Sequence, residues 1–126
     1  MGGEEGIILG LEDDLKDAQL GQIPFPIFIA APVNGFTEIY RNVLGNSIEF
    51  NFMWYALSSG SATLTLKIDG TPITGWTSVA LTTASGGATA TAAKTLPSGS
   101  ILGLEFSSCA APTNLRLSLK GNMVLT

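Results

Sequence analysis

The clearest pattern of apolar and polar positions lies in residues 61–75, SATLTLKIDGTPITG. From Ala62 to Ile68 apolar side chains alternate with polar ones, which is the period of a strand with one buried and one solvated face. Asp69 and Gly70 then favour the positive φ values of a two-residue hairpin turn. Pro72 lacks an N–H donor, so it is expected at a sheet edge or among the first residues of the return strand. The pattern predicts an antiparallel hairpin and an all-β protein.

Other segments with strand-like patterns follow one another at short intervals, separated by Gly, Asn, Ser and Pro. They are Ile23–Ala31, Phe36–Val43, Ser47–Leu57, Trp76–Thr82, Ala88–Ala93, Ile101–Ser107 and Leu115–Leu119, with Met123–Leu125 resuming the last pattern. The two prolines in IPFPIFIAA restrict the first segment to an edge strand or an extended connector. This succession predicts one antiparallel β-sandwich of jelly-roll type over residues 23–126.

The predicted core consists of apolar residues at inward strand positions. They are Phe50, Phe52, Leu64, Leu66, Ile68, Leu102, Leu104, Phe106, Leu115, Leu117 and Leu119.

The segment Ser47–Leu57, SIEFNFMWYAL, is apolar on both faces in its second half. Strict alternation places Phe52 inward and Met53, Tyr55 and Leu57 on the opposite, outer face. An outer sandwich face is expected to be polar, so something must cover these three side chains. Either a loop of the same chain or a neighbouring subunit can do so. We take the second as the working hypothesis, with Met53, Tyr55 and Leu57 as an oligomer interface, most simply in a homotrimer.

Residues 1–22 differ from the rest of the chain in charge. They hold six acidic residues and Lys16, a net charge of −5, whereas residues 23–126 hold five basic and four acidic residues, a net charge of +1. One interpretation is a flexible terminus. The other is an arm that becomes ordered on a partner, with the acids steering it towards a basic surface. In that case the contacts come from its apolar residues, Ile7, Ile8, Leu9, Leu11 and Leu15.

Composition excludes most catalytic and metal chemistry. Charged residues make up 13% of the chain, about half the usual share. Such a surface is typical of a subunit that other proteins cover. One cysteine, Cys109, and no histidine leave neither a disulfide nor a Cys/His zinc site. A nucleophile would have no histidine as its base, which leaves only lysine or carboxylate variants. We expect no enzyme activity and no cofactor.

Nucleic acid and membranes are not expected as partners. The five bases of residues 23–126 are scattered, whereas phosphate binding requires clustered Lys and Arg. The uncharged run Ala18–Thr37 is interrupted by three prolines and is too short in its apolar part to span a bilayer. The first residues lack the pattern of a secretory signal. We therefore expect synthesis and assembly in a cytoplasm.

Three aromatic residues support one binding hypothesis. Trp54, Tyr55 and Trp76 together have the chemistry of a sugar-stacking platform, although packing in the core or in an interface is the common role of such residues.

From about Ser61 to Leu119, four features occur in a recognisable order: the LTLKIDGTPITG hairpin, a pair of Thr/Ala-rich strands, a PSGS turn into a hydrophobic strand, and a closing NLRLSL strand. This order resembles a β-sandwich module of tailed-phage virion proteins, found in head decoration and head-fibre proteins and at tail-fibre tips. The resemblance implies a trimeric, non-enzymatic structural protein. Fibre-tip members usually follow a long shaft, and here only the short arm precedes the sandwich. That difference favours a subunit attached directly to a capsid or tail surface.

The sequence thus predicts a bacteriophage virion structural protein, assembled in the host cytoplasm. It would be a capsid decoration or head-fibre subunit that attaches through its arm to the major capsid protein or another virion protein. The alternative is a tail-associated receptor- or carbohydrate-binding module.

Overall fold

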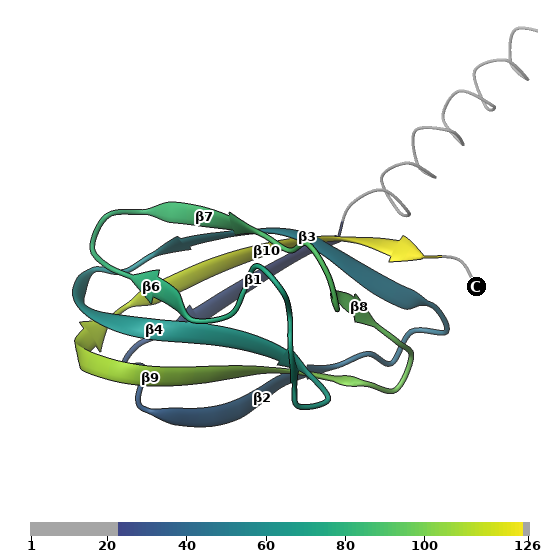
Figure 1. Ribbon diagram of the computed structural model, residues 1–126, viewed down its shortest axis with the longest axis horizontal. Coiled ribbons are helices and arrows are strands. Elements are labelled where there is room, and N and C mark those ends of the chain that lie inside the picture. The colour runs from purple at the N-terminus through teal and green to yellow at the C-terminus, as the bar shows by residue number, and fades with distance from the viewer. Residues whose placement is uncertain (1–22, 125–126) are drawn as a thin grey trace, which may run out of the picture.

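The computed structural model describes residues 23–124, which form ten strands in two antiparallel sheets packed face to face (Figure 1). The strands are β1 Ile23–Ile29, β2 Gly35–Arg41, β3 Ser47–Ala56, β4 Ser59–Ile68, β5 Thr71–Pro72, β6 Val79–Leu81, β7 Gly86–Thr89, β8 Thr95–Leu96, β9 Ile101–Thr113 and β10 Leu115–Val124. The all-β sandwich predicted from the sequence is confirmed.

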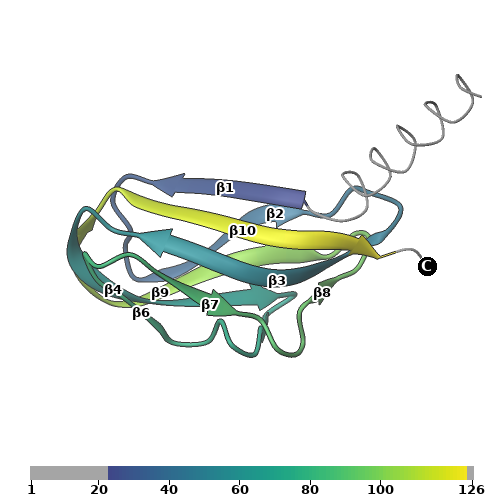
Figure 2. The ribbon, with the colours of Figure 1, turned by 90° about the horizontal axis from the view of Figure 1, so that it is seen from above.

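The strand order is that of a jelly roll. Sheet A has the order β1-β10-β3-β7, with β8 also pairing with β3 (Figure 2). Sheet B has the order β2-β9-β4-β5, with β6 also pairing with β4. The chain behaves as one long hairpin rolled into two sheets, because β1 pairs with β10, β2 with β9, β3 with β7 and β8, and β4 with β5 and β6. These nested pairs define the jelly roll that the sequence predicted.

The hairpin of β4 and β5 forms as expected. The inward side chains of β4, from Ala62 to Ile68, are buried. Asp69 and Gly70 have φ values of 50° and 85°, the left-handed backbone of a type I′ turn. Pro72 pairs only with Lys67 and lies at the edge of sheet B, where its missing donor breaks no ladder.

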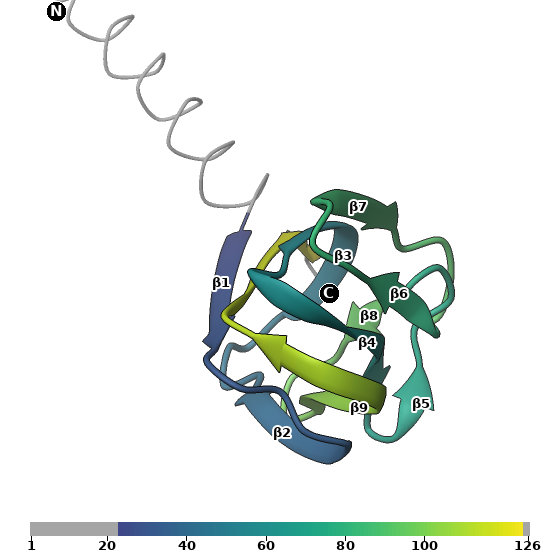
Figure 3. The same cartoon turned by 90° about the vertical axis from the view of Figure 1, so that its left-hand side faces the viewer.

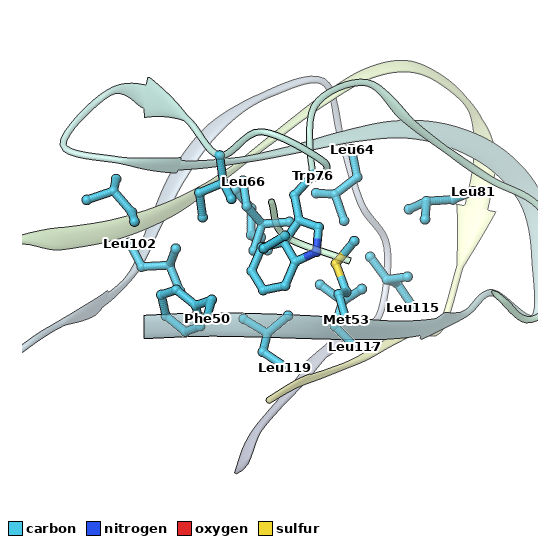
Figure 4. Packing of buried hydrophobic residues seen from close by; sticks show 14 of the residues in the cluster. Phe50, Met53, Leu64, Leu66, Trp76, Leu81, Leu102, Leu115, Leu117 and Leu119 are labelled. Atoms are coloured by element: carbon cyan, nitrogen blue, oxygen red, sulfur yellow. The ribbon is translucent and has the colours of Figure 1, made fainter. Parts of the chain in front are cut away.

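The core lies between the two sheets and contains side chains of both (Figure 4). Its centre is aromatic: the ring centroid of Phe50 lies 5.6 Å from that of Trp76 and 5.7 Å from that of Phe25. All the predicted core residues except Phe52 are buried. Leu81 is buried, as its inward position in the segment Trp76–Thr82 predicts, and Trp76 packs in the core, the common role of such a residue. Met53, Leu57, Ile73 and Leu96 belong to the core as well, although the sequence did not place them there.

A β-bulge in β3 reverses the predicted faces of its second half. Lys120 of β10 pairs with Phe52 and the next residue, Gly121, pairs with Phe50, so Asn51 is an extra residue in β3. One extra residue changes which face every following side chain points to. Phe52 therefore points outward and is 40% exposed, whereas Met53 is fully buried. The prediction that Phe52 belongs to the core is wrong for this reason.

Candidate interaction surface

The predicted oligomer interface lies inside the subunit. Met53 is fully buried, Leu57 is 4% exposed, and the partly buried Tyr55 packs against the core. Their burial within the sandwich requires neither a loop over the outer face nor a second subunit. After the bulge at Asn51 they point towards sheet B and form part of the sandwich core. The assignment of Met53, Tyr55 and Leu57 to a subunit contact is therefore withdrawn.

The three aromatic residues of the predicted glycan platform do not share a surface. Trp76 is fully buried, and its indole Nε1 donates a hydrogen bond to the carbonyl oxygen of Ala88 at 2.9 Å. Tyr55 points inward and its ring lies against Gly86. Trp54 points outward and is 43% exposed. A platform of Trp54, Tyr55 and Trp76 is thus excluded, and only Trp54 is available to a ligand.

The proposed attachment arm lies outside the described residues. Ile7, Ile8, Leu9, Leu11 and Leu15 all precede Ile23, where the described chain begins.

The outer face of sheet A presents aromatic and basic side chains together. Trp54 lies opposite Ser118 of β10, and Phe52 lies opposite Lys120. Arg116, two residues before Ser118 in β10, lies opposite Ala56 of β3 on one side and opposite Phe28 of β1 on the other. Gly87 on β7 leaves room for this arrangement, because a side chain there would collide with the ring of Phe52. The four residues Phe52, Trp54, Arg116 and Lys120 are called the aromatic-basic face below.

A second apolar surface lies where the edges of the two sheets meet. β1 ends sheet A and β2 ends sheet B on the same side of the sandwich (Figure 3). Between them is a groove of about 420 Å³ lined by β1, the β1–β2 connection, β2 and Phe106. Every lining residue is apolar except Thr37, and none is charged. Phe28 and Val33 of its rim are 60% and 71% exposed. We call it the edge groove.

The edge groove is protected against open-ended strand pairing. Pro24 and Pro26 occupy alternate positions in β1, and all seven residues of β1 pair with β10 on the other side. Proline has no N–H, so the free edge of β1 has no hydrogen-bond donor at Pro24 or Pro26. An additional strand would find few donors there. Contacts at this edge must use side chains instead.

Most acidic residues of the described chain already have partners. Glu105 pairs with Lys67 at 3.0 Å, and Glu49 with Lys94 at 3.8 Å. The Ser100 hydroxyl and the Ile101 amide donate hydrogen bonds to Asp69 and hold the pKa of its carboxyl below the usual value. Asp69 lies in a second pocket, of about 490 Å³. Its carboxylate there holds the start of β9 and is not available for chemistry of its own.

One buried polar residue had no signal in the sequence. Asn42 is fully buried just after β2, and its side-chain amide donates to the carbonyl oxygens of Asn46 and Leu96, both at 2.9 Å. Its Oδ1 accepts from the amide of Leu44. These bonds hold the turn at residues 42–46 against Leu96 of β8, which is a structural role.

Metal-binding and reactive groups are sparse in the described part of the chain. Residues 23–124 contain no cluster of three His, Cys, Asp or Glu side chains that could hold a metal ion. Cys109 is half-buried in β9, and burial raises the pKa of its thiol, which opposes formation of the reactive thiolate. No helix within residues 23–124 has the length and apolarity needed to cross a bilayer.

Comparison with known proteins adds no relative. No protein-family model matches the chain, and no curated protein matches it significantly.

Proposed function

We propose that this protein is a non-enzymatic structural subunit of a bacteriophage virion, a capsid decoration or head-fibre subunit. It would form a homotrimer and attach to the major capsid protein or another virion protein through residues 1–22. The observation that carries the proposal is the exposure of large apolar side chains on a jelly roll that has few charges. Residues 23–126 contain only nine charged residues. Within the described part of the chain, six large apolar side chains are exposed: Phe28, Val33, Phe36, Val43, Phe52 and Trp54. A surface of this kind favours assembly with other proteins.

The fold supports the same proposal. Jelly rolls recur in viral capsid proteins and lectins. Fold alone does not identify a function, so the argument depends on the surfaces that this jelly roll exposes. The resemblance of residues 61–119 to phage virion modules points to the virion in preference to other assemblies.

The edge groove is the best candidate for the contact between subunits. Its lining is uncharged, so burial against an apolar partner desolvates no charge. The two prolines of β1 disfavour strand pairing along that edge, which favours a contact made there by side chains. Met53, Tyr55 and Leu57 have no part in this contact.

Two experiments test the proposal. Full-length protein should sediment with tailed-phage particles that lack this chain, and protein without residues 1–22 should not, while keeping its β-rich circular dichroism spectrum. Phe28→Asp should convert the trimer to monomers in analytical ultracentrifugation, because it places a charge in the edge groove. Thr83→Asp adds the same charge at an exposed position between β6 and β7 and should leave the trimer intact. Equal particle binding by the truncated protein would show that the sandwich, and not the arm, attaches.

The alternative, a tail-associated receptor- or carbohydrate-binding module, now depends on Trp54. This residue is exposed, and stacking on a sugar ring would use its free face. Glycan addition should then change the tryptophan fluorescence, and Trp54→Phe should remove the change without loss of fold. A glycan response that survives in Trp54→Phe would exclude this site.

A further inference from the structure

The aromatic-basic face combines exposed apolar area with unpaired positive charge. Phe52 and Trp54 are 40% and 43% exposed, beside Lys120 and Arg116 on the neighbouring strand. Arg116 and Lys120 form no ion pair with any acid of residues 23–124. Glu49 lies on the same sheet beyond the bulge, and its carboxylate is paired with Lys94. The face thus presents two uncompensated cations within an aromatic surface.

The presence of both apolar area and positive charge determines which kind of partner can bind to this face. An apolar partner alone would leave both cations without compensation, and a highly charged partner alone would not cover the indole and phenyl rings. A peptide that mixes carboxylates with large aliphatic side chains satisfies both requirements. The edge groove differs in this respect, because no charged residue lines it.

The chain itself contains such a peptide. Residues 4–15, EEGIILGLEDDL, hold five acidic residues, no basic residue, and five large aliphatic side chains. Their charge is opposite to that of the face. Attraction between these charges would be strongest at low salt, since the Debye length is about 10 Å at 0.1 M ionic strength.

The segment that connects residues 4–15 to β1 is long enough for these residues to reach the aromatic-basic face of the same molecule. β1 starts at Ile23, opposite Gly121 and next to the pair of Pro24 with Lys120. Residues 16–22 separate the acidic segment from β1 and can span about 23–25 Å when extended. Crossing from β1 over β10 to β3 requires two strand spacings, about 10 Å. A tether of this length gives an effective concentration in the millimolar range, so even weak contacts are populated.

We propose that the aromatic-basic face is a docking surface for an acidic, aliphatic peptide, and that its occupant in the free protein is residues 4–15 of the same chain. The arm would leave this face when it binds a partner. The inference goes beyond the proposed function because it concerns the protein in solution and requires no particle.

Quenching of tryptophan fluorescence by acrylamide tests the proposal in the full-length protein. Trp76 is fully buried, so the quencher chiefly reports on Trp54. Neutralising the arm, by changing Glu4, Glu5 and Glu12 to Gln and Asp13 and Asp14 to Asn, should increase the quenching constant several-fold. These positions all precede Ile23, where the described chain begins, and the sandwich core is made by residues 23–124.

A variant of the face itself should give the same result. Arg116→Ser with Lys120→Ser should also raise the quenching constant, as should high salt in the unmodified protein. The matched control is Lys67→Gln with Lys94→Gln, which removes two cations elsewhere and gives the same change in net charge. It should leave quenching at the level of the unmodified protein.

Three results would overturn the proposal. Equal, high quenching in the unmodified protein and in both variants means that the face is free. Protection that persists in the arm variant means that something other than the acidic arm covers Trp54. Protection that disappears on dilution together with dissociation of the oligomer means that the occupant comes from a neighbouring copy. Protection that is independent of protein concentration and lost in both variants is the expected outcome.

Discussion

The bulge at Asn51 determines which side chains of β3 support the core, and two neighbouring alanine substitutions test it. Met53 is fully buried between the sheets, whereas Phe52 is 40% exposed on the outer face. Strict alternation of β3 assigns the two residues the opposite positions. The order of destabilisation by Met53→Ala and Phe52→Ala therefore distinguishes the bulged strand from a regular one.

The expected magnitudes follow from burial. Met53→Ala removes a fully buried side chain and should cost about 2–5 kcal/mol, including the cavity it leaves. Phe52 retains only part of its burial, mainly against Gly87, so Phe52→Ala should lose about 1–2 kcal/mol of the roughly 1.5–3 kcal/mol that full burial of Phe provides. With an unfolding entropy near 0.2 kcal/mol per degree for about 100 residues, Met53→Ala should lower Tm by about 10–25 °C.

Thermal unfolding by circular dichroism, supported by urea titration, measures both variants. A larger loss of stability for Phe52→Ala than for Met53→Ala would refute the bulged register.

Three further changes probe other features of the fold. Asn42→Ala should cost about 1–3 kcal/mol in chemical denaturation, because it leaves the buried carbonyl of Leu96 without its donor; an unchanged midpoint would contradict this. Gly75→Ala should cost about 1–3 kcal/mol, because Gly75 has a φ of 94° and an added Cβ would collide with the backbone of β7, whereas Gly45→Ala, with open space around it, should be nearly neutral. Asp69→Asn keeps a good turn residue but removes a carboxylate whose pKa is lowered in the fold, so the unmodified protein should be the more stable above pH 4 or so. That advantage should shrink as the pH falls through the folded pKa, and a difference that persists at lower pH would show that the carboxylate charge is not its source.

The sequence was sufficient wherever local pattern and packing agree. The alternation from Ala62 to Ile68, the Asp69-Gly70 turn and the prolines of β1 each depend on a few neighbouring residues, and each is found as expected. None of these local features requires knowledge of distant contacts. The jelly-roll type was predicted from the number and spacing of short strands, but the strand order was not, because it depends on pairs far apart in the sequence, such as β1 with β10.

Trp76 shows where local pattern is not enough. It lies between β5 and β6, outside a regular strand, yet its ring packs on Phe50 and its backbone carbonyl accepts from the amide of Leu66. Nothing in the spacing of residues 73–82 distinguishes a buried tryptophan from an exposed one. Its position depends on contacts with both sheets, which only the assembled fold supplies.

The faces of β3 were misassigned because the sequence is ambiguous at the point where the register changes. Positions 49 and 51 are polar, but 53, 55 and 57 of the same alternating set are apolar, which is the pattern that a change of face produces. The even-numbered positions show no matching change to polar residues, because Phe52 and Trp54 are apolar like Ile48 and Phe50. A regular strand with two apolar faces therefore fits the sequence equally well.

This ambiguity has a functional consequence. After a bulge, an ordinary sandwich strand would place polar residues at positions 52 and 54, because those side chains meet solvent. Phe52 and Trp54 stand there instead, 40% and 43% exposed, beside Arg116 and Lys120, which form no ion pair with an acid of residues 23–124. The extra residue at Asn51 therefore has two effects. It directs Met53, Tyr55 and Leu57 into the core, and it places Phe52 and Trp54 on the outer face of sheet A, where we propose that the acidic arm docks. The bulge thus exchanges the two faces: the side chains predicted for the outer face lie in the core, and Phe52, predicted for the core, lies on the outer face.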